Sequence, residues 1–106
     1  MTFNSYGNEY EIGFEINKYI ENGNVQIQMM CLEDGWWGPF ASMTVNLGIK
    51  CGEGCGSVDT NNVKGIEEWI DENELGEPTG RYGESGWCVY PEYRFDMDKI
   101  RENLVR

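Results

Sequence analysis

Two stretches in the first half of the chain alternate apolar and polar residues with the period of a half-buried β-strand. In the first stretch the apolar positions are Tyr10, Ile12, Phe14 and Ile16. In the second stretch they are Val25, Ile27, Met29 and Cys31. The dipeptide Asn22-Gly23 lies between them and suits the positive φ angles of a tight hairpin turn. The pattern therefore predicts an antiparallel hairpin with one apolar face.

A third alternating run follows, and its apolar positions are Ala41, Met43, Val45 and Leu47. We expect segment 33–39, which holds Trp36 and Trp37 between two glycines, to form the loop that leads into this run. Three strands in succession predict an antiparallel meander.

The second half of the chain begins with a glycine-rich segment, 48–57, and then changes to a helical period. The apolar positions of this helix are Val63, Ile66 and Ile70, and they share one face. Residues 59–62 offer N-cap side chains. Gly76 and Pro78 form a common helix stop.

The remaining residues predict a turn-rich stretch, a strand and a short helix. Residues 79–86 form the turns, and the strand covers 87–95, where Pro91 indicates an edge or a break. Asp96 is a candidate cap for the last helix, whose inner positions are Met97, Ile100 and Leu104. The order β-β-β-α-β-α predicts a single α+β domain over 1–106, a mainly antiparallel sheet with two helices on one face.

The composition excludes several classes of function. The chain has 19 acidic and 8 basic residues, a formal net charge of -11, and no histidine. Without histidine there is no Ser-His-Asp triad, no Cys-His dyad and no histidine-ligated metal. The negative charge argues against direct binding to a nucleic-acid backbone.

The chain also lacks the usual signs of membrane insertion or secretion. No apolar run approaches the roughly 20 residues of a membrane-spanning helix, and residues 1–5 show no signal-peptide pattern. We therefore expect a monomer without membrane contact in a reducing cytoplasm, where stable disulfides are rare.

The four cysteines are the main candidate chemistry: Cys31, Cys51, Cys55 and Cys88. Cys51 and Cys55 are separated by three residues that include two glycines, a spacing that suits a pair of zinc ligands. Four thiolates complete a tetrahedral set, so the pattern predicts a structural Zn2+ site. The alternatives are buried free thiols or a catalytic Cys88, although no histidine is present to activate it.

Acidic residues dominate the predicted helix and the segment that follows it. Between Lys64 and Arg81 there are six acids and no base. Five of them form the predicted partner-binding surface: Glu67, Glu68, Asp71, Glu72 and Glu74. Such a surface favours association with a basic protein, and the alternative is a solvated helix face that keeps the protein soluble.

Trp36 and Trp37 form a second candidate partner-binding surface. Tryptophan is enriched at interface hot spots, and two adjacent tryptophans in a loop are difficult to bury together. The alternative is that one covers the end of the sheet and the other lies over it.

The segment from about residue 59 to residue 95 resembles a small bacterial family of unknown function that phages and other mobile elements often carry. The matching pieces are 59–62, 65–68, 75–81 and 85–93. The resemblance implies a shared fold, a mobile-element origin and the cytoplasm of a bacterial host cell. The family has no established catalytic residues to transfer.

The size, acidity and cysteine set are also similar in kind to anti-CRISPR inhibitors of type II RNA-guided nucleases, and this resemblance rests on no particular motif. It implies a stoichiometric inhibitor, not an enzyme, that binds a basic region of such a nuclease and blocks nucleic-acid loading or cleavage. One alternative is an acidic accessory protein that binds another basic protein. Another is a small enzyme that uses Cys88 or the carboxylate pair Glu84 and Glu92.

Overall fold

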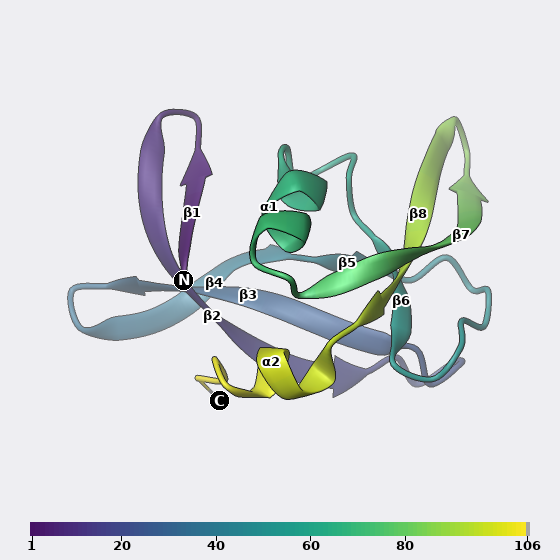
Figure 1. Ribbon diagram of the computed structural model, residues 1–106, viewed down its shortest axis with the longest axis horizontal. Helices are drawn as coiled ribbons and strands as arrows, with labels where there is room; N and C mark the ends of the chain where they lie inside the picture. The colour runs from purple at the N-terminus through teal and green to yellow at the C-terminus, as the bar shows by residue number, and fades with distance from the viewer. Residues whose placement is uncertain (106) are drawn as a thin grey trace.

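The alternating segments of the first half of the chain form an antiparallel sheet of four strands in the order β1-β2-β3-β4 (Figure 1). Their bounds are Thr2–Ser5 for β1, Asn8–Lys18 for β2, Val25–Glu33 for β3 and Trp36–Ser42 for β4. The computed structural model describes residues 1–105, and within that range this sheet is accompanied by a second four-stranded sheet and two short helices.

Tight turns with positive φ angles connect the first strands. Asp34 and Gly35 have φ angles of 51° and 81°, which is the conformation of a two-residue hairpin turn. Tyr6 and Gly7, at 48° and 81°, do the same between β1 and β2. These turns bring β4 and β1 into the sheet on either side of the predicted central hairpin.

The second sheet has the strand order β5-β6-β8-β7 and is also antiparallel. Its strands are Thr44–Val45, Cys55–Val58, Cys88–Phe95 and Gly76–Ser85 in that spatial order. The β7–β8 hairpin projects from the body of the molecule in Figure 1.

Met43 is the point at which the chain passes from the first sheet to the second. Its backbone N–H donates to the carbonyl of Ile27 in β3, and its own carbonyl accepts the N–H of Asp59 directly after β6, both at 2.9 Å. Its side chain is fully buried. One residue therefore holds the ends of both sheets together.

The two helices are short. Helix α1 covers Ile66–Glu72 and follows Gly65, whose φ is 80°. It buries Trp69, whose ring packs edge-on against Phe3 at 5.2 Å and whose Nε1 donates to the carbonyl of Thr2 at 2.7 Å. Figure 1 accordingly shows α1 between the β1–β2 and β7–β8 hairpins.

Helix α2 covers Met97–Arg101, and Asp96 caps it by accepting the N–H of Lys99 at 3.1 Å. The chain then returns to the first sheet. Phe14 donates its N–H to Asn103 and accepts the N–H of Val105, so this C-terminal segment lies beside β2.

A single hydrophobic cluster draws on both sheets and both helices. Its fully buried members include Phe14, Ile27, Val58, Ile70, Tyr93 and Ile100. No helix in residues 1–105 is long and apolar enough to cross a membrane.

The α+β prediction holds only in its coarse form, since the molecule is mostly antiparallel sheet with two short helices. The predicted order β-β-β-α-β-α is wrong, because six strands precede α1 and two lie between the helices. The predicted strand at 41–47 is divided at Met43 between two sheets, and the predicted turns at 79–86 largely belong to β7. Helices of seven and five residues are too short to cover one face of a sheet, and the second sheet completes the core instead.

Candidate functional site

The acidic residues of α1 lie in two different environments. Glu68, Asp71 and Glu72 are exposed on the outer side of the helix. Glu67 is half-buried, and its Oε1 accepts a hydrogen bond from the Tyr93 hydroxyl at 3.0 Å. Glu74 lies beyond the helix end, at a φ of 53°, and is exposed. Glu67 therefore has a half-buried structural contact, whereas the other four acids are exposed.

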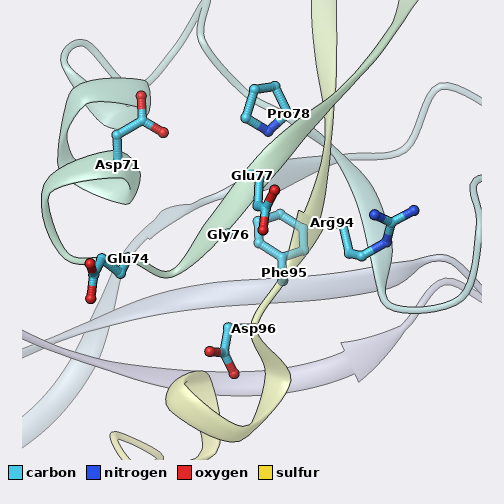
Figure 2. A pocket seen from close by; sticks show the side chains of 8 residues that line it. All are labelled: Asp71, Glu74, Gly76, Glu77, Pro78, Arg94, Phe95 and Asp96. Atoms are coloured by element: carbon cyan, nitrogen blue, oxygen red, sulfur yellow. The ribbon is translucent and has the colours of Figure 1, made fainter.

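A surface groove of about 560 Å³ lies between the C-terminal end of α1, the start of β7 and the end of β8 (Figure 2). Four carboxylates line it: Asp71, Glu74 and Glu77 from one stretch of seven residues, and Asp96 from the end of β8. Pro78 and Phe95 add apolar surface, and Arg94 is the one basic residue of the lining. The groove can receive a positively charged side chain with an apolar stem.

Two of these carboxylates also have contacts inside the molecule. Glu74 Oε2 lies 3.6 Å from Lys99 Nζ, although its side chain remains 84% exposed. Asp96 accepts the Lys99 N–H as the cap of α2. An exposed ion pair of this kind contributes little and is easily exchanged for another cation.

At the groove, β7 packs closely against β8, where Gly76 pairs with Phe95. A Cβ atom on Gly76 would come 2.7 Å from the Arg94 carbonyl oxygen and 3.2 Å from Phe95 Cα. Only glycine fits at this position without moving backbone, so Gly76 is required for the pairing of β7 with β8, whereas α1 has already ended at Glu72.

The sequence identified Asp71 and Glu74 but missed the rest of this groove. Glu77 follows Glu74 closely along the chain, whereas Asp96 comes directly after β8 and is held beside this segment by the hydrogen bond from its N–H to the Leu75 carbonyl at 2.8 Å. Gly76 and Pro78 predict a helix stop from the sequence, whereas in the structure both lie in β7 and line the groove. The groove depends on contacts between distant segments, which no local pattern reveals.

Trp36 and Trp37 do not lie in a loop, as expected, but begin strand β4. Adjacent residues of a strand point to opposite faces. Trp36 is 80% exposed and pairs with Glu33 across the hairpin. Trp37 is half-buried, and its ring lies on the other face beside Gly13, where a Cβ atom would come 3.4 Å from Trp37 Cη2. The side chains of the two predicted partner-binding tryptophans therefore point to opposite faces of β4, although both residues line one pocket beside the β3–β4 hairpin.

The structure does not bring the four cysteines together. Cys31 lies in the first sheet beside Gly38, and Cys88 lies near the turn of the β7–β8 hairpin opposite Ser85. Cys51 and Cys55 are near β6, where the N–H of Cys55 donates to the Gly52 carbonyl. Within residues 1–105 no three cysteine, aspartate or glutamate side chains are grouped to hold a metal ion. The donor set thus does not fit the predicted four-cysteine Zn2+ site.

All four cysteines are free thiols, and the protonated state of three is favoured by burial. Burial, together with the neighbouring Glu92, raises the pKa of Cys51 to about 11. Burial also raises the pKa of Cys31 and of Cys55 above the ordinary thiol value. Such thiols are poor nucleophiles at neutral pH.

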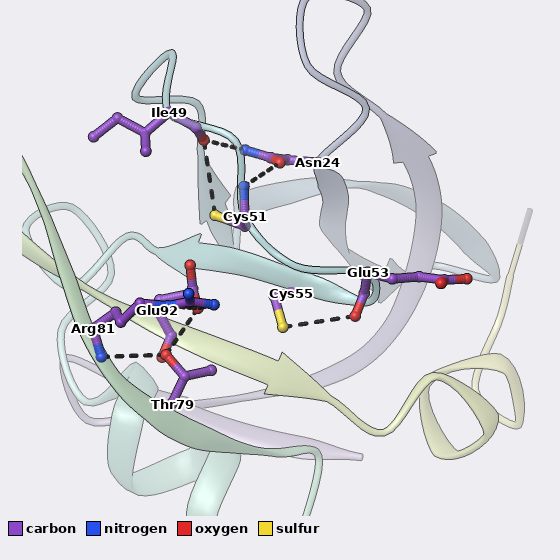
Figure 3. Close-up of polar contacts among 8 residues, drawn as sticks. All are labelled: Asn24, Ile49, Cys51, Glu53, Cys55, Thr79, Arg81 and Glu92. Carbon is purple, nitrogen blue, oxygen red and sulfur yellow. Dashed lines mark hydrogen bonds and ion pairs between the residues drawn. The ribbon is translucent and has the colours of Figure 1, made fainter.

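Glu92 is the centre of a buried polar cluster between β7 and β8 (Figure 3). Its Oε2 accepts hydrogen bonds from Thr79 Oγ1 at 2.8 Å and from Arg81 Nε at 3.0 Å. Burial alone would raise the pKa of Glu92, but hydrogen bonds from Thr79, Arg81 and Cys51 outweigh it and lower the pKa. Glu92 is therefore a permanent carboxylate at neutral pH.

The proposed carboxylate pair Glu84 and Glu92 is not formed. Glu84 pairs with Val89 and shares its face of the hairpin, whereas Glu92 lies an odd number of positions from Val89 on β8 and faces the other way. Cys88 has a tyrosine neighbour, Tyr90, whose pKa is raised by burial and by Cys88. Glu84 and Glu92 thus lie on opposite faces of the β7–β8 hairpin.

The fold and groove define a small acidic domain of two antiparallel sheets with an exposed carboxylate-lined surface. The chain belongs to a family described as a domain of unknown function, DUF4313, and the match covers residues 13–105. This match is longer than the segment on which the family resemblance was recognised in the sequence. No curated protein and no solved structure matches the chain.

Proposed function

We propose that this domain binds a basic protein partner through the acidic groove beside α1. The observation that carries the proposal is that three carboxylates from residues 71–77 and Asp96 from the end of β8 line one groove together with Pro78 and Phe95. Asp71, Glu74 and Glu77 surround a groove in which Phe95 and Pro78 offer apolar contact. A lysine or arginine side chain would place its methylene stem against the exposed Pro78 and its charge among the carboxylates.

The charge of the whole chain supports a basic partner. A formal net charge of -11 on 106 residues accelerates association with a positive surface and disfavours a phosphate backbone. Glu68 and Glu72 extend the acidic surface from the groove along the outer side of α1. The partner is therefore expected to carry an extended basic surface, and its binding to weaken as salt is added.

The partner that we propose is a type II CRISPR RNA-guided nuclease, which holds its guide–target heteroduplex in a positively charged channel. An acidic domain seated on such a channel would block nucleic-acid loading or cleavage stoichiometrically, without chemistry of its own. Another basic protein of the host or of a mobile element is the alternative partner.

Two variants with equal charge changes test the groove. The groove variant carries Asp71→Asn, Glu74→Gln and Glu77→Gln, and the control carries Glu9→Gln, Glu53→Gln and Glu84→Gln at other exposed sites. Each variant removes three negative charges. We expect the wild type and the control to bind a purified type II effector at low salt, and the groove variant to bind about tenfold or more weakly.

The results separate three conclusions. Equal weakening by both variants would mean that overall charge, and not the groove, mediates binding. Absence of binding to any type II effector at micromolar protein and low salt would remove the anti-CRISPR assignment. In that case, capture of a basic host protein that depends on Asp71, Glu74 and Glu77 would support the accessory-protein alternative.

A further inference from the structure

The core-facing side of the first sheet continues past the part that the rest of the molecule covers. Ile12 and Cys31 are directly paired and buried on this side. Further along the β3–β4 hairpin, Glu33 and Trp36 are directly paired on the same side, and Trp36 is 80% exposed. The end of an otherwise buried sheet face is thus open to solvent.

A pocket of about 480 Å³ occupies this open end. Its aromatic walls include Trp36, Phe40 and Tyr10, and the rings of Phe40 and Tyr10 are 4.9 Å apart. Gly38 lies between Trp36 and Phe40 on β4, and a Cβ built on it would meet nothing within 4 Å. The pocket exists because this strand carries a glycine where a side chain would otherwise fill the space.

Carboxylates stand at the edge of the aromatic walls. Glu33 is exposed opposite Trp36, and Asp34 is exposed in the adjoining turn. Both line the pocket. An apolar ligand would remove water from these charges without replacing it, which is unfavourable. A cation would pair with the carboxylates and with the ring faces together.

We propose that this pocket binds an arginine side chain of an extended segment in a protein partner. The planar guanidinium group stacks on an indole face and donates several hydrogen bonds in its own plane, so Trp36, Glu33 and Asp34 can contact it simultaneously. This site is on a different sheet from the acidic groove and does not depend on it.

The test uses a short acetylated peptide of alternating arginine and glycine, followed by NMR of the ¹⁵N-labelled protein. We expect saturable shifts of the Trp36 indole and Gly38 amide signals, and none of the Trp87 indole signal. The matched peptide with citrulline, which is neutral and similar in shape, should bind about fivefold or more weakly because the cation–π and ion-pair contacts are lost.

Three variants locate the binding. Trp36→Ala removes an exposed ring, and Gly38→Val adds a branched side chain where a Cβ atom meets nothing within 4 Å; both should weaken binding about fivefold or more. Trp87→Ala removes a fully exposed tryptophan from the turn of another hairpin and should have no effect. Dispersed spectra of the variants would show that they are folded.

The outcomes distinguish this pocket from the groove. Unchanged binding by folded Trp36→Ala, or equal binding of the citrulline peptide, would overturn the proposal. Shifts confined to Asp71, Glu74 and Glu77 would overturn it as well while supporting the groove. Shifts confined to Trp36 and Gly38 would support the pocket and leave the groove without support from this peptide.

Discussion

Arg81 contacts a single carboxylate oxygen of Glu92 twice, through a hydrogen bond from Nε at 3.0 Å and an ion pair with Nη2 at 2.9 Å. The pair spans the place where β7 departs from regular pairing. Pro78 is opposite Tyr93 and Tyr82 is opposite Pro91, so three residues of β7 face Glu92 alone. Because Thr79 and Arg81 in this bulged stretch both donate to the Glu92 carboxylate, they hold the stretch against β8.

The Glu92→Gln variant should therefore lower the free energy of unfolding. Charged hydrogen bonds that are lost at a buried carboxylate cost about 2 kcal/mol, and the Glu92 side chain is 9% exposed. Urea denaturation at neutral pH measures the change. The exposed Glu84→Gln on the same hairpin is the control and should leave the unfolding free energy within about 0.5 kcal/mol of wild type.

The contribution of Glu92 should also depend on pH. Its pKa is lowered in the folded protein, mainly because the hydrogen bonds from Thr79 and Arg81 overcome the effect of burial. The stabilisation is therefore complete above the unfolded glutamate pKa of about 4.3 and is lost as the pH falls through the folded value. The stability difference between wild type and Glu92→Gln should shrink below about pH 4. A constant difference over the acid range would contradict this assignment.

Truncation of two adjacent acids of α1 should change the stability of the protein by different amounts. Glu67→Ala removes the acceptor of the buried Tyr93 hydroxyl and should cost about 1 kcal/mol of stability. Glu68→Ala removes an exposed carboxylate from the same helix and should be nearly neutral. Thermal unfolding of both variants measures this contrast, and equal melting temperatures would show that the Tyr93 contact carries no stability.

Metal removal should have no effect on the folded protein. The thiols of Cys31 and Cys88 are on different sheets and cannot share one tetrahedral ion with Cys51 and Cys55. We expect no stoichiometric zinc after dialysis, an unchanged melting temperature with chelator, and slow alkylation of Cys51 until the pH approaches its pKa of about 11. One equivalent of zinc that is lost together with the fold would restore the four-cysteine site.

Gly13→Ala should detach the C-terminal segment from β2. A Cβ at this position would overlap the Val105 side chain and come 3.0 Å from the Asn103 carbonyl oxygen. Overpacking of this kind costs about 1–3 kcal/mol. Hydrogen exchange at the Phe14 and Val105 amides, which bond across this contact, should become faster. Gly38→Ala is the control, because its Cβ meets open space.

The sequence predicted the central hairpin because apolar residues occupy every second position from Tyr10 to Ile16 and from Val25 to Cys31, with Met30 the one apolar residue on the opposite face of the second stretch. It did not predict β4 from Trp36, since the glycines around the tryptophans indicated a loop. The Asp34-Gly35 turn was present as a hairpin signal but was included in that loop. The turn residues Asp34 and Gly35 thus favoured a hairpin, but the overall glycine content of segment 33–39 led to the prediction of a loop.

Strand β7 could not be recognised from its own residues. Gly76, Pro78 and Gly80 disfavour a strand, and pairing with β8 overrides them. The same reason limited the site prediction. Acids close in sequence, such as Asp71 and Glu74, were found, whereas Asp96 joins them only through the tertiary fold.

The position of Met43 has a consequence for how the molecule unfolds. Its N–H is hydrogen-bonded to the first sheet and its carbonyl to the end of the second, and its side chain is in the shared core. Unfolding of the first sheet would break the hydrogen bond from Met43 to Ile27, and unfolding of the second would break the bond from Asp59 to Met43. Either event would also expose the buried Met43 side chain to solvent. Heating or denaturant should therefore produce one cooperative transition, with tryptophan fluorescence and backbone circular dichroism changing together.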